Sequence, residues 1–373
     1  MAEPVKTLLL SQNDLVSLGV VDMDRCLDVV EEVYTLLGKG DYLMGGPLGN
    51  EHGQMIYFPK SAPFPGMPVT GPDRRFMSMI AYLGGNYKIC GEKWYGSNAE
   101  NRKKGLPRSV LTVILNDADT GIPFTIMSGN LISAMRTGAV PGVAAKYLAK
   151  RGAETVGVLG GGVINKACLL AIAKSVKSLK TAYVYDVYPA SAEAFGREMH
   201  ERTGLTVVPV NSIEEMTRKS DIITIATSGE AFPRIETSWI PKGCLVTFTG
   251  AADLDIEAFT HNTVIADNWK MHEAFIADGL EHPDGIDSMA VVAPSFPVIK
   301  AVVDKQFDAS RVVDLGKIIN GTAPGRKDDN EIIMFLTGGM PVYDLAWAYT
   351  MYQEAVKKGI GQEYVFFEEA YWK

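Results

Sequence analysis

Three consecutive glycines at a predicted strand-to-helix boundary could form a ligand-binding turn. A buried strand is predicted at TVGVLG and a helix at VINKACLLAIAK, and the boundary holds Gly160, Gly161 and Gly162, followed by Val163 and Ile164. At such a turn, backbone N–H groups and the helix N-terminus face one point and bind phosphate. The turn therefore predicts a site for the pyrophosphate of a dinucleotide, with a tight turn that binds nothing as the alternative.

A carboxylate follows this turn at the spacing that a bound ribose requires. Asp186 ends the second predicted strand, TAYVYD, 24 residues after Gly162. A carboxylate there accepts hydrogen bonds from the ribose hydroxyls and repels a 2′-phosphate, so it favours NAD, and NADP is the less expected cofactor. In the alternative interpretation Asp186 only caps the helix that begins near Ala190. One departure from the dinucleotide fingerprint is Asn165, at a position where Gly or Ala is usual.

The elements around this turn predict the fold that carries it. From residue 154 onward, short apolar runs rich in β-branched residues alternate with amphipathic helices, which is the pattern of a doubly wound parallel sheet. We expect an α/β protein whose Rossmann-like, dinucleotide-binding domain spans 131–334. Ligands of such sheets bind beyond the carboxyl ends of the strands, so Thr249 and Gly250, at the end of CLVTFTG, are further candidates for the cofactor site.

The N-terminal third predicts a different kind of domain. An amphipathic helix is expected within 14–39, most clearly after Asp22, where apolar residues recur at helical spacing. Three strands are expected in succession at FMSMIAYLGG, YKICGEKWYGS and SVLTVILND. Strands in succession suggest a mixed sheet, and hence an α+β domain.

The two predicted domains are joined by helices. A helix over 130–150, with Pro141 as a kink or a break, forms the bridge. The stretch EIIMFLTGG and the long helix after it, 342–359, are expected to return to the first domain. A substrate-binding and dimerisation domain would thus take 1–130 and 335–373.

The composition argues against several classes of function. The 373 residues carry a formal charge of −8 with scattered Lys and Arg, so nucleic acid is not an expected partner. No stretch reaches 18 uninterrupted apolar residues and the N-terminus lacks a signal-peptide pattern, so we expect no membrane contact. Four widely spaced cysteines without a C-x-x-C pair suggest a reducing cytoplasm. The dispersed His52, His272 and His282 are better explained as satisfied loop histidines, so no metal site is expected.

Several blocks together resemble one known family. They are SAMRTGAV around Arg136, GEKWYGSN and LNDADTGIP upstream, GVLGGG downstream, and the closing FLTGGMPVYDLAWAY with Gly339 and Asp344. In order and spacing, from about residue 75 to the end, the chain resembles the ornithine cyclodeaminase and mu-crystallin family. The resemblance implies a two-domain subunit, a homodimer, a bound NAD and a small amino or imino acid as substrate.

The resemblance also implies roles for particular residues. Lys93 and Arg136 match the lysine and arginine that the family offers to its substrate. A guanidinium can hold a carboxylate through two parallel hydrogen bonds, and an ammonium can polarise the group at the reacting carbon. Without the resemblance, both would be read as surface charges. Arg75, in an unusual loop region with Arg74, is a candidate for the substrate pocket, with a surface charge as the alternative.

Further cofactor contacts follow from the same blocks. They are expected beside Arg136 and at the strand ends that the family uses, namely at Thr137, Ala226, Thr227, Ser228 and Gly339. The alternative for the run TIATS is an ordinary turn at the end of a strand.

Two departures from the family pattern bear on the reaction. Ornithine cyclodeaminases carry an acid/base aspartate where this chain has Ala251, and a second family carboxylate would fall near Met77. Cyclodeamination needs a carboxylate that shuttles protons, whereas reduction of an imine needs a carboxylate clamp, a hydride donor and one proton source. Lys93 or Asp253 could supply that proton.

Three functional hypotheses remain at this point. The first is an NAD-dependent oxidoreductase that acts on the C–N bond of a small amino or imino acid, as an imine reductase or amino acid dehydrogenase does. The second is an ornithine or lysine cyclodeaminase that releases ammonia and recycles NAD. The third is a non-catalytic dinucleotide-binding accessory subunit.

Overall fold

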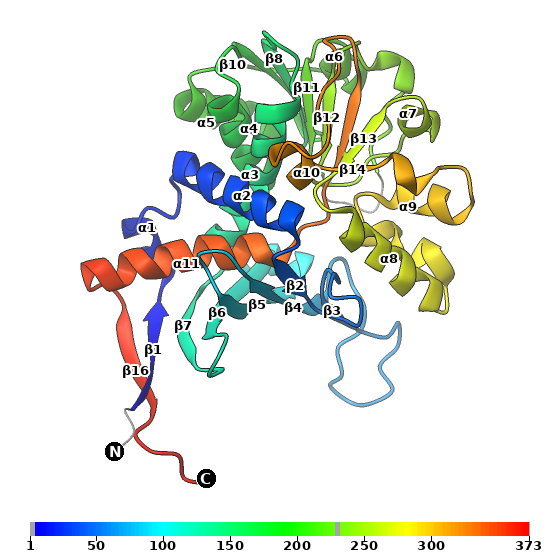
Figure 1. Ribbon diagram of the computed structural model, residues 1–373. Helices are drawn as coiled ribbons and strands as arrows, with labels where there is room; N and C mark the ends of the chain where they lie inside the picture. Colours follow the sequence, from blue (N-terminus) through cyan, green and yellow to red (C-terminus); the bar gives the residue numbers. More distant parts are fainter. Residues whose placement is uncertain (1–3, 228–231, 373) are drawn as a thin grey trace. The chain divides into compact units, whose positions relative to one another are not determined.

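The computed structural model describes residues 4–227 and 232–372, and the chain divides into two compact units (Figure 1). Unit 1 consists of Met1–Asp22, Asp41–Ser133 and Met340–Lys373, and unit 2 of Met23–Gly40 and Ala134–Gly339. The segment Met23–Gly40, which was expected in the first domain, groups with unit 2. The reason is that helix α2 (Met23–Lys39) packs against α4 and α10 of that unit.

Unit 1 is built on a mixed sheet of eight strands in the order β16-β1-β7-β6-β5-β4-β2, with β3 paired to β4. Its strands are β1 (Val5–Leu10), β2 (Tyr42–Met44), β3 (Gln54–Tyr57), β4 (Arg75–Leu83), β5 (Ile89–Ser97), β6 (Ser109–Asp117), β7 (Pro123–Ser128) and β16 (Gln362–Phe367). The run β4 to β7 is antiparallel, whereas β1 pairs parallel with β7. The three strands that the sequence predicts are β4, β5 and β6, and the mixed sheet is as expected. The five shorter or edge strands were not predicted.

One face of this sheet is buried and the other is not. Strand alternation places Met79, Lys93 and Val113 in one row across β4, β5 and β6, and all three are buried. The helices of unit 1 are α1 (Gln12–Ser17) and α11 (Pro341–Lys358), and α11 packs against β4, β5 and β6. Trp347 of α11 is fully buried and donates a hydrogen bond from Nε1 to the carbonyl of Val20 at 3.2 Å.

Unit 2 contains a sheet of eight strands that pair parallel throughout, in the order β10-β9-β8-β11-β12-β15-β13-β14. Its strands are β8 (Thr155–Leu159), β9 (Thr181–Tyr185), β10 (Thr206–Pro209), β11 (Ile222–Ile225), β12 (Leu245–Phe248), β13 (Thr263–Ala266), β14 (Val313–Asp314) and β15 (Ile333–Leu336). The chain order reverses between β8 and β11, and this reversal is where such sheets bind ligands. The predicted Rossmann-like fold is confirmed.

One prediction about this sheet was wrong. EIIMFLTGG was expected to return to the first domain, but β15 lies between β12 and β13 and pairs parallel with both. A four-residue strand buried on both faces carries no alternation that would show which sheet it joins. The chain from Met340 onward, with α11 and β16, belongs to unit 1.

Helices separate the strands of unit 2, and α4 and α5 pack against each other beside β8 to β10 (Figure 1). They are α3 (Asn130–Leu148, whose first residues belong to unit 1), α4 (Val163–Ser175), α5 (Pro189–Thr203), α6 (Ile213–Arg218), α7 (Glu257–Thr260), α8 (Trp269–Glu281), α9 (Phe296–Val303) and α10 (Leu315–Ile319). Helix α3 runs without a break through Pro141. A Cβ on Gly138 would lie 2.5 Å from the Cβ of Ala167, so glycine there lets α3 approach α4 closely.

Candidate functional site

The glycine turn of unit 2 has the open geometry that a phosphate site requires. Gly160 has φ of 95°, a left-handed conformation that glycine adopts without strain. Gly162 is the N-cap of α4, and among the described residues, its chain neighbours apart, no atom lies within 4 Å of the position that a Cβ would take. Val163, the first residue of the helix, is 68% exposed, and Ile164 follows it. The N-terminus of a 13-residue helix is thus accessible, and a pyrophosphate fits there.

Asn165, which departs from the dinucleotide fingerprint, braces this turn. The side chain is fully buried, and its amide Nδ2 donates to the carbonyls of Leu159 and Gly160, both at 2.7 Å. Its Oδ1 accepts a hydrogen bond from Oγ1 of Thr224 in β11 at 3.1 Å. All three contacts hold the glycine turn against the neighbouring strand, so the substitution replaces close helix packing with hydrogen bonds.

Asp186 lies at the end of β9 beside the same turn. Its Oδ2 accepts from the N–H of Gly161 at 2.7 Å, and its Oδ1 accepts from the N–H of Tyr188 at 2.9 Å. Tyr188 is the N-cap residue of α5, so this carboxylate connects the glycine turn with the start of that helix. Val187 and Tyr188 are 73% and 70% exposed. Exposed apolar groups beside a carboxylate are the surroundings that an adenosine needs.

The ends of β11 and β12 meet at the same edge of the sheet. Oγ1 of Thr227 donates to the carbonyl of Ala251 at 2.9 Å. The N–H groups of Thr249 and Gly250 both donate to the carbonyl of Ile225. A Cβ on Gly250 would lie 2.8 Å from the nitrogen of Thr227, so this contact requires glycine.

The structure brings most of the predicted cofactor residues together. A Cβ on Gly160 would lie 3.2 Å from the carbonyl oxygen of Ala226, so the glycine turn and the end of β11 are adjacent. Thr137 lies on α3 one residue before Gly138, where that helix contacts α4. Gly339, with φ of 73°, ends unit 2 after β15. Ser228 lies outside the described residues.

Asp253 has surroundings unlike those of a buried acid. Its carboxylate is 57% exposed and lies 3.5 Å from Nη1 of Arg234. Arg234 also pairs with Glu236 at 3.0 Å and with Asp255 at 2.6 Å. Asp253 is therefore one of three carboxylates around a single surface guanidinium.

Lys93, in contrast to the exposed Asp253, is a charged group buried away from water. In unit 1 its ammonium is 3.0 Å from Oδ2 of Asp344 and 3.4 Å from Oγ of Ser133. The side chain of Lys93 is 3% exposed and that of Asp344 is not exposed at all. Asp344 lies within a block that resembles the family, but its pairing with the lysine was not predicted, because 251 residues separate the two. Arg136, on α3 in unit 2, is also buried, with 4% exposure.

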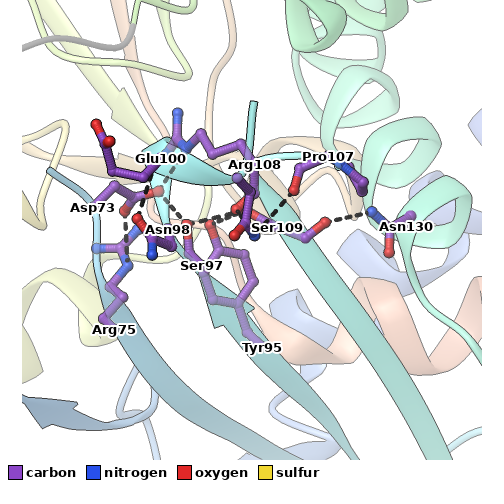
Figure 2. A network of polar contacts seen from close by, with 11 residues as sticks. Asp73, Arg75, Tyr95, Ser97, Asn98, Glu100, Pro107, Arg108, Ser109 and Asn130 are labelled. Carbon is purple, nitrogen blue, oxygen red and sulfur yellow. Dashed lines mark hydrogen bonds and ion pairs between the residues drawn. The ribbon is translucent and has the colours of Figure 1, made fainter. Parts of the chain in front are cut away.

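Arg75 belongs to a polar network on the sheet of unit 1 (Figure 2). Its Nε is 3.2 Å from Oδ1 of Asp73, and Nε of Arg108 is 2.5 Å from Oδ2 of the same carboxylate. Ser97 also donates to Asp73. Sequence reasoning missed Asp73 and Arg108, since neither lies in a regular element that an alternating pattern would reveal.

Tyr95 completes this network, and its hydroxyl accepts a hydrogen bond from Ser109 at 2.9 Å. Burial and the Asp73 carboxylate raise the pKa of the Tyr95 phenol. Hydrogen bonds with Ser109 and Ser97 and the charge of Arg75 outweigh them, so the pKa lies below its ordinary value. The guanidinium carbon of Arg75 lies 5.5 Å from the centre of the Tyr95 ring, which holds the cation against the ring face.

The described residues contain neither a cluster of metal ligands nor a helix that could span a membrane. Within 4–227 and 232–372, no group of three or more His, Cys, Asp or Glu side chains is placed to hold a metal ion. No helix among those residues has the length and hydropathy to cross a membrane. His272 lies in helix α8 rather than in a loop, where its ring nitrogens contact Ser295 at 2.7 Å and Asp267 at 3.1 Å. It is thus a satisfied core histidine.

Comparisons with known proteins agree with this geometry. The model of the ornithine cyclodeaminase/mu-crystallin family matches residues 20–359. The chain is 28% identical to alanine dehydrogenase of Archaeoglobus fulgidus, over 97% of this chain and 99% of that protein. It is also 28% identical to N-((2S)-2-amino-2-carboxyethyl)-L-glutamate dehydrogenase of Staphylococcus aureus, over 77% and 81%. The solved structure of Delta(1)-pyrroline-2-carboxylate reductase from Thermococcus litoralis, in complex with NADH and L-proline, has a TM-score of 0.77 and 28% identity, covering 95% and 99%.

The buried pair of Lys93 and Asp344 predicts how the free energy of unfolding changes when one or both charges are removed. Asp344→Leu leaves the buried ammonium without this carboxylate, and we expect the free energy of unfolding to fall by about 3–5 kcal/mol. The double variant Lys93→Met, Asp344→Leu removes both charges and should recover most of that loss. Urea denaturation followed by circular dichroism measures both.

The exposed pair of Lys103 and Glu100 provides the control. Glu100→Ala should change the free energy of unfolding by less than about 1 kcal/mol, because solvent screens that pair. A double variant as unstable as Asp344→Leu alone would show that the loss comes from packing and not from charge.

Proposed function

Because the chain belongs to the ornithine cyclodeaminase/mu-crystallin family, we propose that it is an NAD-dependent oxidoreductase acting on the C–N bond of a small amino or imino acid. The relatives compared above are dehydrogenases and a reductase of amino and imino acids. The observation that carries the proposal is the Lys93 ammonium, which is buried and paired with Asp344. Proton-bearing groups kept from water in this way are typical of sites that transfer protons.

The residues of unit 2 that would hold NAD are those of the glycine turn and the strand ends beside it. The N–H groups of 160–163 would receive the pyrophosphate, and Asp186 would exchange its contact with Gly161 for the ribose hydroxyls. The ends of β11 and β12 would line the nicotinamide half. When bound, NAD accepts or supplies the hydride at the carbon that bears nitrogen.

The substrate needs a carboxylate clamp and a proton source. We assign the clamp to Arg136, since a guanidinium offers two parallel N–H groups to a carboxylate. We assign the proton to Lys93, since Asp253 is exposed and shared with Arg234. Asp344 is the counterion that keeps Lys93 charged when the substrate excludes water. In this assignment Arg136 would hold the carboxylate of an imino acid, and Lys93 would polarise its nitrogen and protonate it.

The other two hypotheses have less support. At the position of the cyclodeaminase aspartate, Ala251 offers only its backbone carbonyl, which accepts from Thr227. No proton shuttle for ammonia loss follows from that group. A non-catalytic binding protein would have no need of a buried lysine and carboxylate, whose desolvation costs stability.

We further propose that the protein forms a homodimer through the outer face of the unit 1 sheet. Exposed apolar side chains gather there, with Ile80 at 49%, Trp94 at 40% and Val110 at 56% exposure. The ring of Phe76 stacks on that of Trp94, with 5.9 Å between the ring centroids. Apolar patches of this kind mark contact surfaces.

We also propose a reducing, cytoplasmic location, which is supported by the four cysteines, because none of them forms a disulfide.

The proposed activity predicts oxidation of NADH. Protein mixed with NADH, ammonia or an amine, and a panel of 2-oxo acids should lower the absorbance at 340 nm with at least one acid. Arg136→Met should lower kcat/KM by about a hundredfold or more, because a charge-assisted carboxylate contact is lost. Lys93→Ala should abolish turnover. Both variants should bind NADH as the unaltered protein does, and a protein that binds NADH but turns over no acid would contradict the proposal.

Asp186 predicts the choice of cofactor. Asp186→Ala removes the acceptor for the ribose hydroxyls and the repulsion of a 2′-phosphate, so KM for NADH should rise about tenfold. The ratio of activity with NADPH to activity with NADH should rise as well. Steady-state kinetics with each cofactor measures both effects. Glu193→Ala, an exposed carboxylate in α5, is the matched control and should change neither value.

The dimer face predicts a change of mass in solution. Trp94→Glu places a charge in the apolar face, and its desolvation would oppose association. Light scattering on a sizing column should give twice the 40.5 kDa chain mass for the unaltered protein and the single mass for the variant. Lys103→Glu, at an exposed position outside this face, should leave the mass unchanged. A variant that keeps the double mass would place the interface elsewhere.

A further inference from the structure

The face of the unit 1 sheet that carries Lys93 holds a second group of polar side chains further along. Side chains of β5 alternate between the two faces, so Lys93, Tyr95 and Ser97 share one face. The register places Arg75 of β4 and Ser109 of β6 on either side of Ser97. This second row lies four residues from Lys93, which corresponds to about 13 Å along the strand.

Two arginines share one carboxylate in this row (Figure 2). Asp73 contacts Arg75 and Arg108, in each case through Nε, and it also accepts from Ser97. Two guanidiniums have about ten N–H donors, whereas one carboxylate has about four acceptor sites. The donors therefore outnumber what Asp73 can accept, and the three charged groups sum to one positive charge.

The surroundings keep this charge accessible and in place. The side chains of Arg75 and Arg108 are 24% and 31% exposed, so a solute can reach them. The nearby Glu100 is paired with Lys103 at 2.5 Å and does not offset the arginines. The Tyr95 ring lies against the guanidinium of Arg75, which restricts its motion.

We propose that Arg75 and Arg108 bind a second carboxylate of the substrate, so that the substrate class is a small amino or imino dicarboxylic acid. The forked N–H groups of guanidinium match the two oxygens of a carboxylate. A short diacid could bridge the two groups where the long side chains of Lys93 and the two arginines extend toward each other along this face, within the strand span of about 13 Å. This inference rests on the proposed function, because it assumes that the reacting carbon lies beside Lys93.

The test compares acids of equal length that differ only at the far end. The unaltered protein, with NADH and ammonia, should show a higher kcat/KM for 2-oxoglutarate than for 2-oxovalerate or for the neutral amide 2-oxoglutaramate. Arg108→Gln should lower the ratio of diacid to monoacid about tenfold to a hundredfold, the effect of one charge-assisted hydrogen bond. Arg108→Lys should retain part of the preference, since it keeps the charge but not the fork. The exposed Arg102→Gln is the matched control and should leave the ratio unchanged.

A binding measurement separates the two proposals. Calorimetry on the NADH-loaded protein should show that glutarate binds more tightly than valerate. Arg108→Gln should remove this difference in affinity. Turnover without a diacid preference, or an equal loss on both acids with a lower melting temperature, would overturn the dicarboxylate site and leave the proposed reaction intact. Binding of glutarate that depends on Arg108, without turnover of any acid, would support the site and overturn the reaction.

Discussion

A buried ammonium is stable only beside an anionic partner, and in unit 1 this requirement joins Lys93 to Asp344 across 251 residues of sequence. For the two to meet, the last helix has to lie over β4, β5 and β6. The same helix then covers the apolar rows of that sheet, which include Met79 and Val113. The ion pair and the hydrophobic core of unit 1 therefore depend on one arrangement, and the lysine remains in a dry position where its charge has the largest effect.

Unit 2 meets a different constraint, which is the close approach of backbone segments. The glycine turn after β8 and the ends of β11 and β12 come so near one another that side chains at Gly160 or Gly250 would crowd the neighbouring strand end. Asn165 adds hydrogen bonds to two carbonyls of the turn and one from Thr224. These contacts fix the open N-terminus of α4 without placing a side chain in front of it. The turn is therefore held in place for the pyrophosphate that we propose it binds.

The charged candidate residues differ in how far they are buried, and this difference favours the reduction of an imine over cyclodeamination. Lys93 is buried with one counterion, whereas Asp253 is an exposed member of the group around Arg234. Reduction of an imine needs one proton at nitrogen, which a single buried ammonium can hold. Arg75 and Arg108 share one carboxylate on the same sheet. On our proposals, this face of the sheet would combine a proton source with a site for a second negative charge.

The sequence by itself determined the local parts of this protein. The strand, the glycine turn at 160–162 and Asp186 fall within about thirty residues, and strand and helix periodicity records such short-range order. Tertiary structure alone decided the partners of the buried and clustered charges: Asp344 for Lys93, and Asp73 with Arg108 for Arg75. It also inserted β15 into the parallel sheet, which its short apolar run did not reveal. The physical reason is that helix and strand periodicity reflects contacts between residues close together in the chain. Ion pairs and the order of strands in a sheet depend instead on the path of the whole chain.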